Sequence, residues 1–169
     1  DHHDNRTYNY FQAAPANLRR TFDALIADKL QNFVGRQFVF DAVDDFINNN
    51  PSGYFIIRGS PGIGKSALTA KLVNTRGYIH HFNIASQNIR GSRAFLENVC
   101  KQLVARYNLK EKNPPVTAYD DGGFLMECLD EAATDPKNHP VVIAVDSLDE
   151  ADRPSLSPNV YSLYLPCLL

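Results

Sequence analysis

The residues with the clearest chemical potential form one glycine-rich segment in the first half of the chain. It reads Gly59-Ser60-Pro61-Gly62-Ile63-Gly64-Lys65-Ser66 and fits the pattern GxxxxGK[ST]. Glycines let such a loop bend closely around phosphate groups, so that backbone amides point inward at the anion. Lys65 would supply a cation for the β- and γ-phosphates, and Ser66 a hydroxyl for Mg²⁺. We therefore predict a nucleoside-triphosphate site at residues 59–66, together with Ala67 in the helix that follows.

Carboxylates gather after a second apolar run, Val141-Val142-Ile143-Ala144-Val145, in the order Asp146-Ser147-Leu148-Asp149-Glu150. We expect Asp146, at the end of a buried strand, to hold Mg²⁺ together with Ser66. Asp149 or Glu150 would orient the attacking water as a general base, and the sequence does not separate the two. The alternative for this second acid is a carboxylate at the start of a helix, which the helix dipole favours. With Lys65, these two acids are the candidate catalytic residues.

The same region bears on the choice of nucleotide base. A Ras-like GTPase would carry DxxG at this strand end, but Asp149 stands at the glycine position, and the guanine-selecting pattern [NT]KxD does not occur in the chain. These two observations favour adenine over guanine. The expected ligands are therefore ATP or ADP with Mg²⁺.

Apolar spacing predicts the elements that position these residues. Strands are expected at 54–58, 78–84 and 141–145. Helices are expected at 17–32, 37–48, 65–74, 92–107 and around 124–133. Strands that alternate with helices indicate an α/β fold with a parallel sheet and crossover helices. We expect His80 and His81, within the second strand, to be packing residues.

Composition narrows the class of protein. The chain has 169 residues, 44% of them hydrophobic and 21% charged, and a net charge of −2, which gives no electrostatic case for a nucleic-acid or membrane partner. Three widely spaced cysteines indicate reduced thiols in a cytoplasmic protein. No apolar run is long enough to span a bilayer. His2 and His3 are interpreted as solvated, not as metal ligands.

Two motifs together resemble a known family. Val34-Gly35-Arg36 precedes the glycine-rich loop, and the acidic strand end reads VIAVDSLDE. This combination resembles the signal-transduction ATPases with numerous domains (STAND), in particular their NACHT-like branch. The resemblance implies a three-layer αβα P-loop NTPase fold of the ASCE type, with Val34, Gly35 and Arg36 against the adenine side of the nucleotide. From the residues alone, a Gly-Arg turn between two helices could approach a ligand, or could be a plain interhelical turn.

The resemblance also implies an organisation. A lead-in segment (1–16) would precede helices carrying the Val-Gly-Arg element (17–50) and then a P-loop core (51–169). The core would be the N-terminal part of a nucleotide-binding domain, cut after the acidic strand and its following helix. In that family a further strand lies between the strands corresponding to 54–58 and 141–145. Without it, the sheet would have a gap or would re-pair, leaving apolar edges exposed.

Several functions fit these motifs. The preferred hypothesis is a regulatory ATPase switch with slow hydrolysis, which self-associates or works with additional C-terminal domains. An AAA+ motor or initiator is the first alternative, because origin-recognition-like AAA+ proteins share the Gly-Arg element. A non-catalytic nucleotide-binding scaffold is the second. A small-molecule P-loop kinase is weaker, since the acidic cluster gives it no particular support.

Overall fold

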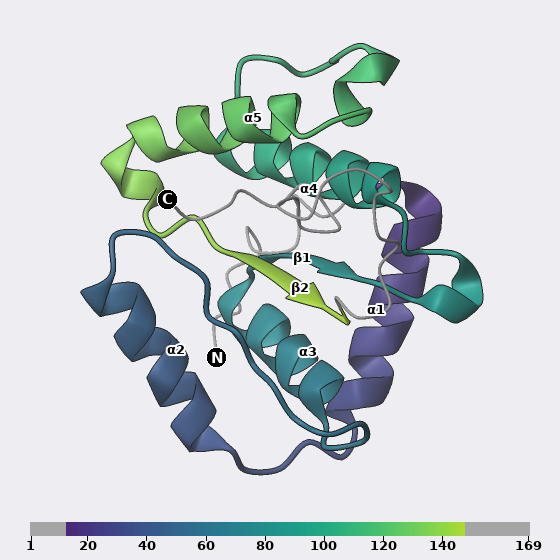
Figure 1. Cartoon of the computed structure of the whole chain (residues 1–169), viewed down its shortest axis with the longest axis vertical. Helices are drawn as coiled ribbons and strands as arrows, with labels where there is room; N and C mark the ends of the chain where they lie inside the picture. Colours follow the sequence, from purple (N-terminus) through teal and green to yellow (C-terminus); the bar gives the residue numbers. More distant parts are fainter. Residues whose placement is uncertain (1–12, 148–169) are drawn as a thin grey trace.

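The computed structural model of the chain describes residues 13–147, shown in Figure 1. The helices are α1 (Ala16–Leu30), α2 (Gln37–Asn49), α3 (Lys65–Arg76), α4 (Ser92–Tyr107) and α5 (Gly123–Thr134), and the strands are β1 (Ile79–Phe82) and β2 (Ile143–Asp146). Short 3₁₀ turns lie at Ala85–Gln87, Val116–Tyr119 and Pro136–Asn138. Every helix predicted between residues 17 and 134 is confirmed to within a few residues at its ends.

The sheet within the described residues consists of β1 and β2, which run parallel. Their register pairs Ile79 with Ile143 at one end and Phe82 with Asp146 at the other. These strands confirm two of the three predicted strand positions, and the chain between them forms α4 and α5. Because the strands are parallel, their carboxyl ends meet at one edge of the sheet, and Asp146 lies at that edge.

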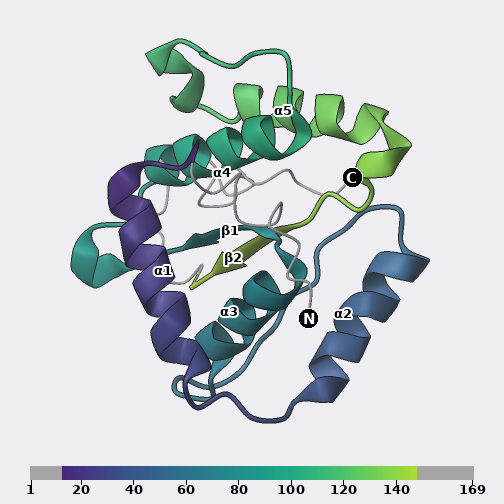
Figure 2. The same cartoon turned by 180° about the vertical axis from the view of Figure 1, so that it is seen from behind.

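Side chains of β2 and the residues just before it alternate between two apolar cores. Val141, Ile143 and Val145 pack against the core built with α1, α4 and α5, while Val142 and Ala144 pack against the core built with α2 and α3. Figures 1 and 2 show α4 and α5 on one side of the sheet and α3 on the other, with α1 passing the end to which both strands point. This is the αβα layering that the family resemblance implies.

The predicted buried strand at 54–58 is wrong. The structure has an irregular segment there, with Phe55 40% and Ile56 63% exposed, while Ile57 packs into the core beside α2 and α3. A strand needs neighbours for its backbone groups, and the two-stranded sheet of the described residues does not include this segment. The expected parallel sheet is therefore smaller than predicted.

A layer of polar side chains lies buried between β1 and α4. The side-chain nitrogens of Asn98 and Gln102 both donate to the main-chain oxygen of His80 at 2.9 Å. The main-chain amide of His80 donates in turn to Oε1 of Gln102 at 3.1 Å. The Asn98 amide also lies 3.0 Å from Nδ1 of His81, so Nδ1 is the acceptor and this imidazole is neutral. His80 and His81 are 4% and 0% exposed, which confirms that they are packing residues.

Burial lowers the pKa of both histidines, to about 4 for His80 and about 3 for His81. The cause is the cost of placing a charged imidazole in an apolar environment.

Within residues 13–147, no helix has both the length and the apolar character needed to cross a membrane.

Candidate nucleotide-binding site

The glycine-rich loop leads directly into the first turn of α3. Gly62 and Gly64 have φ values of +80° and +89°, a conformation that side chains disfavour, and Gly64 is the residue that caps α3. A Cβ at Gly62 would meet no atom within 4 Å, so this part of the loop faces open space. A Cβ at Gly59 would instead lie 2.9 Å from Cγ2 of Ile63, so a side chain there would force Ile63 to move.

The position of the loop suits an anion. The amides at the start of α3 have no partners within the helix and carry the positive end of its dipole. Lys65, the first residue of α3, extends its ammonium over the loop and donates to the main-chain oxygens of Gly59 at 2.6 Å and Ser60 at 3.2 Å. The loop therefore combines backbone donors with a cation, as the sequence predicts.

Ser66 and Asp146, which the sequence assigns to the same metal, are in direct contact. The Ser66 hydroxyl donates to Oδ2 of Asp146 at 2.6 Å, and the Ser147 hydroxyl donates to the same oxygen at 3.0 Å. Asp146 is 7% exposed. A hydroxyl that donates its hydrogen to this carboxylate keeps its oxygen lone pairs, so Ser66 can still serve as a metal ligand.

Two further residues hold Asp146 in place, and sequence reasoning missed both. Thr69 of α3 lies with its hydroxyl 3.3 Å from Oδ1 of Asp146. Asn83, just after β1, donates to the main-chain oxygen of Asp146 from its backbone amide at 3.2 Å and from its side chain at 3.0 Å. A parallel pairing of β1 with β2 would have placed Asn83 beside Asp146, but the register of two strands cannot be read from either strand alone.

The Val34-Gly35-Arg36 element reaches the loop through its arginine. Gly35 and Arg36 have φ values of +79° and +64°, so the chain turns sharply before α2. The Arg36 guanidinium donates to the main-chain oxygen of Ile63. A Cβ on Gly64 would lie 3.3 Å from each terminal nitrogen of Arg36. Val34 is 87% exposed, and its expected place beside adenine stays a prediction.

The other site residues predicted from the sequence lie on the surface of the loop, in α3, or outside the described residues. Ser60, Pro61 and Ile63 lie on the exposed outer part of the loop, and Ala67 is half-buried in the first turn of α3. Asp149 and Glu150, the candidate general bases, lie outside the described residues. The structure thus brings together the loop, Arg36 and Asp146.

The donor set fits a magnesium-bound nucleotide. In residues 13–147 no cluster of three or more His, Cys, Asp or Glu side chains could hold a metal by protein ligands alone. Mg²⁺ commonly uses one or two protein oxygens and completes its shell with water and substrate phosphates. Ser66 and Asp146 supply such a pair of oxygens beside a loop suited to phosphate.

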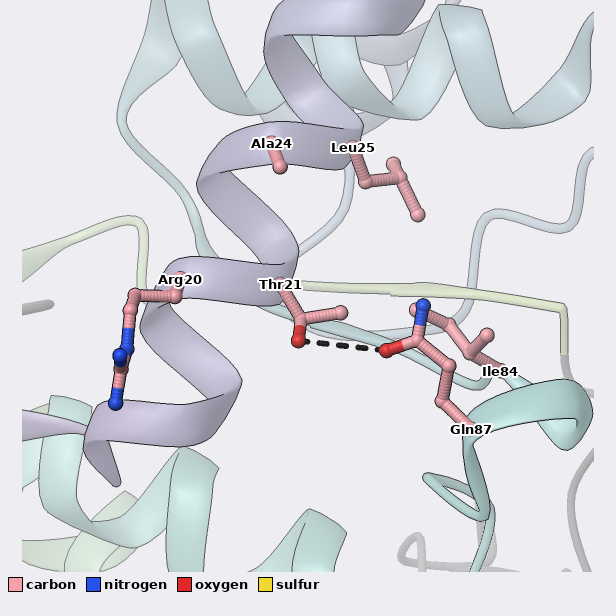
Figure 3. A pocket seen from close by; sticks show the side chains of 6 residues that line it. All are labelled: Arg20, Thr21, Ala24, Leu25, Ile84 and Gln87. Atoms are coloured by element: carbon pink, nitrogen blue, oxygen red, sulfur yellow. Dashed lines mark hydrogen bonds between the residues drawn. The ribbon is translucent and has the colours of Figure 1, made fainter.

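A separate hollow of about 410 Å³ lies between α1 and the turn after β1 (Figure 3). Its walls include Thr21 and Gln87, whose side-chain oxygens lie 3.4 Å apart. The other lining residues are Arg20, Ala24, Leu25 and Ile84. None of these residues belongs to the glycine-rich loop, and none stands in a motif that would predict this hollow.

Comparison with known proteins gives one family. The sequence model described as AAA ATPase domain matches residues 32–164. That range includes the Gly-Arg turn, the glycine-rich loop and the acidic strand end. Searches of curated proteins and of solved structures give no significant match.

Proposed function

The chain belongs to the AAA ATPase domain family, and we propose that it binds Mg-ATP at residues 59–67 and acts as a regulatory ATPase switch. Slow hydrolysis of ATP to ADP would reset the switch. Ser66 and Asp146 would hold Mg²⁺, and Lys65 would bind the β- and γ-phosphates. Adenine is the proposed base, with Val34, Gly35 and Arg36 on its side of the site.

The observation that supports this proposal most directly is the hydrogen bond from Ser66 to Asp146. A glycine-rich loop alone would support only an anion site. A buried carboxylate that meets the loop serine adds a place for a divalent cation beside the phosphates. Bound Mg²⁺ would neutralise phosphate charge and polarise the bond to be broken.

Groups of the chain itself would orient the phosphates, bind them and accept a proton. The amides at the start of α3 would orient the phosphates, and the Lys65 ammonium would exchange its contacts with the oxygens of Gly59 and Ser60 for phosphate oxygens. Asp149 or Glu150 is proposed to accept the proton of the attacking water.

Regulation requires that ATP and ADP favour different arrangements, because a ligand shifts an equilibrium only by binding two states unequally. Arg36 could couple the bound nucleotide to α2, since its hydrogen bond joins the start of α2 to the loop at Ile63. A change in the conformation of the loop would therefore act on α2 through this bond. The proposed switch and its slow turnover also draw on the resemblance to STAND proteins.

The central test is the affinity of the full chain for a fluorescent ATP analogue in the presence of Mg²⁺. Lys65→Ala should weaken binding by tenfold or more, since a hydrogen bond to a charged group contributes about 1.5–3 kcal/mol. Lys71→Ala, on the same helix but outside the loop, serves as the matched control and should bind normally. Unchanged affinity in Lys65→Ala would refute the proposed site.

Hydrolysis separates the switch from its alternatives. Glu150→Gln or Asp149→Asn should stop phosphate release while the chain still binds ATP. A non-catalytic scaffold would bind ATP, release no phosphate, and be insensitive to both substitutions. An AAA+ motor would instead show fast turnover that rises with protein concentration, because such motors take a catalytic arginine from a neighbouring subunit.

A further inference from the structure

Thr69 lies one turn into α3, facing the carboxylate of Asp146. It is 9% exposed. Its hydroxyl oxygen lies 3.2 Å from the main-chain oxygen of Lys65 and 3.3 Å from Oδ1 of Asp146. One hydroxyl has one hydrogen, so these two acceptors share it.

The two acceptors do not depend on Thr69 equally. The Lys65 oxygen is a main-chain carbonyl within a helix, where it can accept from the amide one turn later. Asp146 is 7% exposed, and its Oδ2 accepts from the hydroxyls of Ser66 and Ser147, whereas the contact at Oδ1 comes from Thr69. A hydrogen bond to an ionised carboxylate is also stronger than one to a neutral carbonyl. Loss of the Thr69 hydroxyl would therefore affect Asp146 more than the helix.

We propose that Thr69 is a positioning residue for the magnesium site. Rotation about the last bond of an aspartate side chain has broad energy minima, so contacts at both oxygens are needed to fix the plane of the carboxylate. The Thr69 hydroxyl holds Oδ1, and this keeps Oδ2 directed at Ser66. This inference rests on the proposed function and deepens it, because it assigns the control of Mg²⁺ affinity to a residue outside the loop.

The proposal is tested by metal binding, measured apart from hydrolysis. Mn²⁺, followed by electron paramagnetic resonance, replaces Mg²⁺ in the full chain with a non-hydrolysable ATP analogue. Thr69→Val keeps the shape of the side chain without the hydroxyl and should weaken metal affinity about tenfold, as expected when an outer partner of a metal ligand is removed. Affinity for the analogue in EDTA should be unchanged. Thr69→Ser should restore metal affinity to within about twofold of the natural chain.

Thr75→Val is the matched control. Thr75 lies on the same helix and its hydroxyl donates to the Lys71 main-chain oxygen at 2.7 Å, so it makes the same kind of bond within the helix. Its metal affinity should equal that of the natural chain. Normal metal affinity in Thr69→Val would overturn the proposal. Equal losses in Thr69→Val and Thr69→Ser would do so as well, because the shape of the side chain would then be responsible.

Folding and the proposed function are checked separately. If Thr69→Val does not fold by circular dichroism, Thr69→Ala also lacks the hydroxyl and favours the helix, and the same loss of affinity is expected; normal metal affinity there would overturn the proposal. Lys65→Ala and Ser66→Ala test the nucleotide site itself. If neither alters binding, the proposed function fails. If both weaken binding and the Thr69 variants do not, only the assignment of Thr69 fails.

Discussion

The hydroxyl of Ser66 lies 2.6 Å from Oδ2 of Asp146, and this hydrogen bond joins residues 80 positions apart in the chain. Ser66 stands in the first turn of α3 and Asp146 ends β2. The contact exists because α3 packs on the sheet through the core that includes Leu68, Leu72 and Ala144. Geometry at the proposed metal position therefore depends on the packing of an apolar core.

Replacement of the carboxylate should remove the metal-dependent part of nucleotide affinity. Asp146→Asn keeps the size of the side chain but loses the negative charge that favours a divalent cation. We expect ATP affinity in Mg²⁺ to fall about tenfold or more, and affinity in EDTA to stay the same. Equilibrium binding of a fluorescent ATP analogue measures both values. Asp130→Asn, at an exposed position on α5, is the control. Equal affinities of Asp146→Asn and the natural chain in Mg²⁺ would contradict the assignment.

Substitution of Gly64 should lower the free energy of unfolding more than substitution of Gly62, because only Gly64 adjoins Arg36. Gly62→Ala and Gly64→Ala both force alanine into a left-handed conformation, at about 1–2 kcal/mol each. The new Cβ at residue 64 would also crowd the Arg36 guanidinium, whereas that at 62 meets nothing within 4 Å. We expect Gly64→Ala to lower the free energy of unfolding further, by about 0.5 kcal/mol or more.

Urea denaturation of the single variants and of their combinations with Arg36→Ala isolates this contact. In the Arg36→Ala background, the two glycine substitutions should cost the same. An extra cost at Gly64 that persists without Arg36 would show that the crowding comes from another group.

Stability should decline as pH falls below 6.5, because two buried histidines are neutral in the folded chain. Their pKa values are lowered by burial to about 4 (His80) and about 3 (His81), from 6.5 in the unfolded chain. Between pH 6.5 and 4 the unfolded state binds more protons, so the unfolding free energy falls with falling pH. The slope should approach about 1.4 kcal/mol per pH unit for each histidine. Above pH 6.5 this contribution is complete and constant.

Chemical denaturation at several pH values measures this slope. His81→Asn keeps an acceptor for the Asn98 amide and removes one titrating group. Its slope between pH 6.5 and 4 should be smaller by up to about 1.4 kcal/mol per pH unit, whatever its stability at pH 7.5. His139→Asn, at an exposed position, is the control substitution. An unaltered slope in His81→Asn would mean that His81 does not resist protonation in the fold.

The ion pair between Asp44 of α2 and Arg76 of α3 should contribute only modestly to the free energy of unfolding. Both carboxylate oxygens accept from the guanidinium, with 2.7 Å between Oδ2 and Nη2, and this bonding lowers the pKa of Asp44 below its usual 3.8. Both side chains are about a third exposed, so solvent screens the pair. Asp44→Asn should therefore cost only about 0.5–1 kcal/mol, and less at high salt.

Thermal unfolding at low and high salt checks the size of this effect, with Asp45→Asn as the neighbouring exposed control. A loss above about 2 kcal/mol would indicate that Asp44 is far less screened than its exposure implies. Since the pKa is lowered, the stabilisation should be present above pH 3.8 and be lost below it, a more acidic range than most of the histidine effect.

Local patterns were sufficient for the helices and for two strands. Helical spacing of apolar residues fixes which face of a helix is buried, and α1 to α5 lie where that spacing placed them. The segment at 54–58 shows the limit of such patterns. Its apolar residues predict burial, but a strand forms only where a neighbouring strand pairs with its backbone. That pairing depends on residues distant in the sequence.

The candidate site also has features that consecutive residues predict and features that depend on how the elements pack. The loop and the position of Asp146 follow from consecutive residues, so the sequence was enough to find them. The roles of Thr69 and Asn83 follow from how α3, β1 and β2 pack, and neither residue stands in a recognisable motif. Arg36 lies between these cases: the sequence allowed either an approach to a ligand or a plain interhelical turn, and the structure places its guanidinium on the loop oxygen of Ile63.

The contact between Arg36 and the glycine-rich loop also affects the entropy of binding. The Arg36 guanidinium holds the main-chain oxygen of Ile63. A loop fixed in this way has lost its conformational freedom when the chain folds, before any phosphate arrives. Preorganisation of this kind strengthens association, because little ordering remains to oppose it. It also predicts that weakening the Arg36 contact would slow capture of the anion even where every phosphate-binding group is retained.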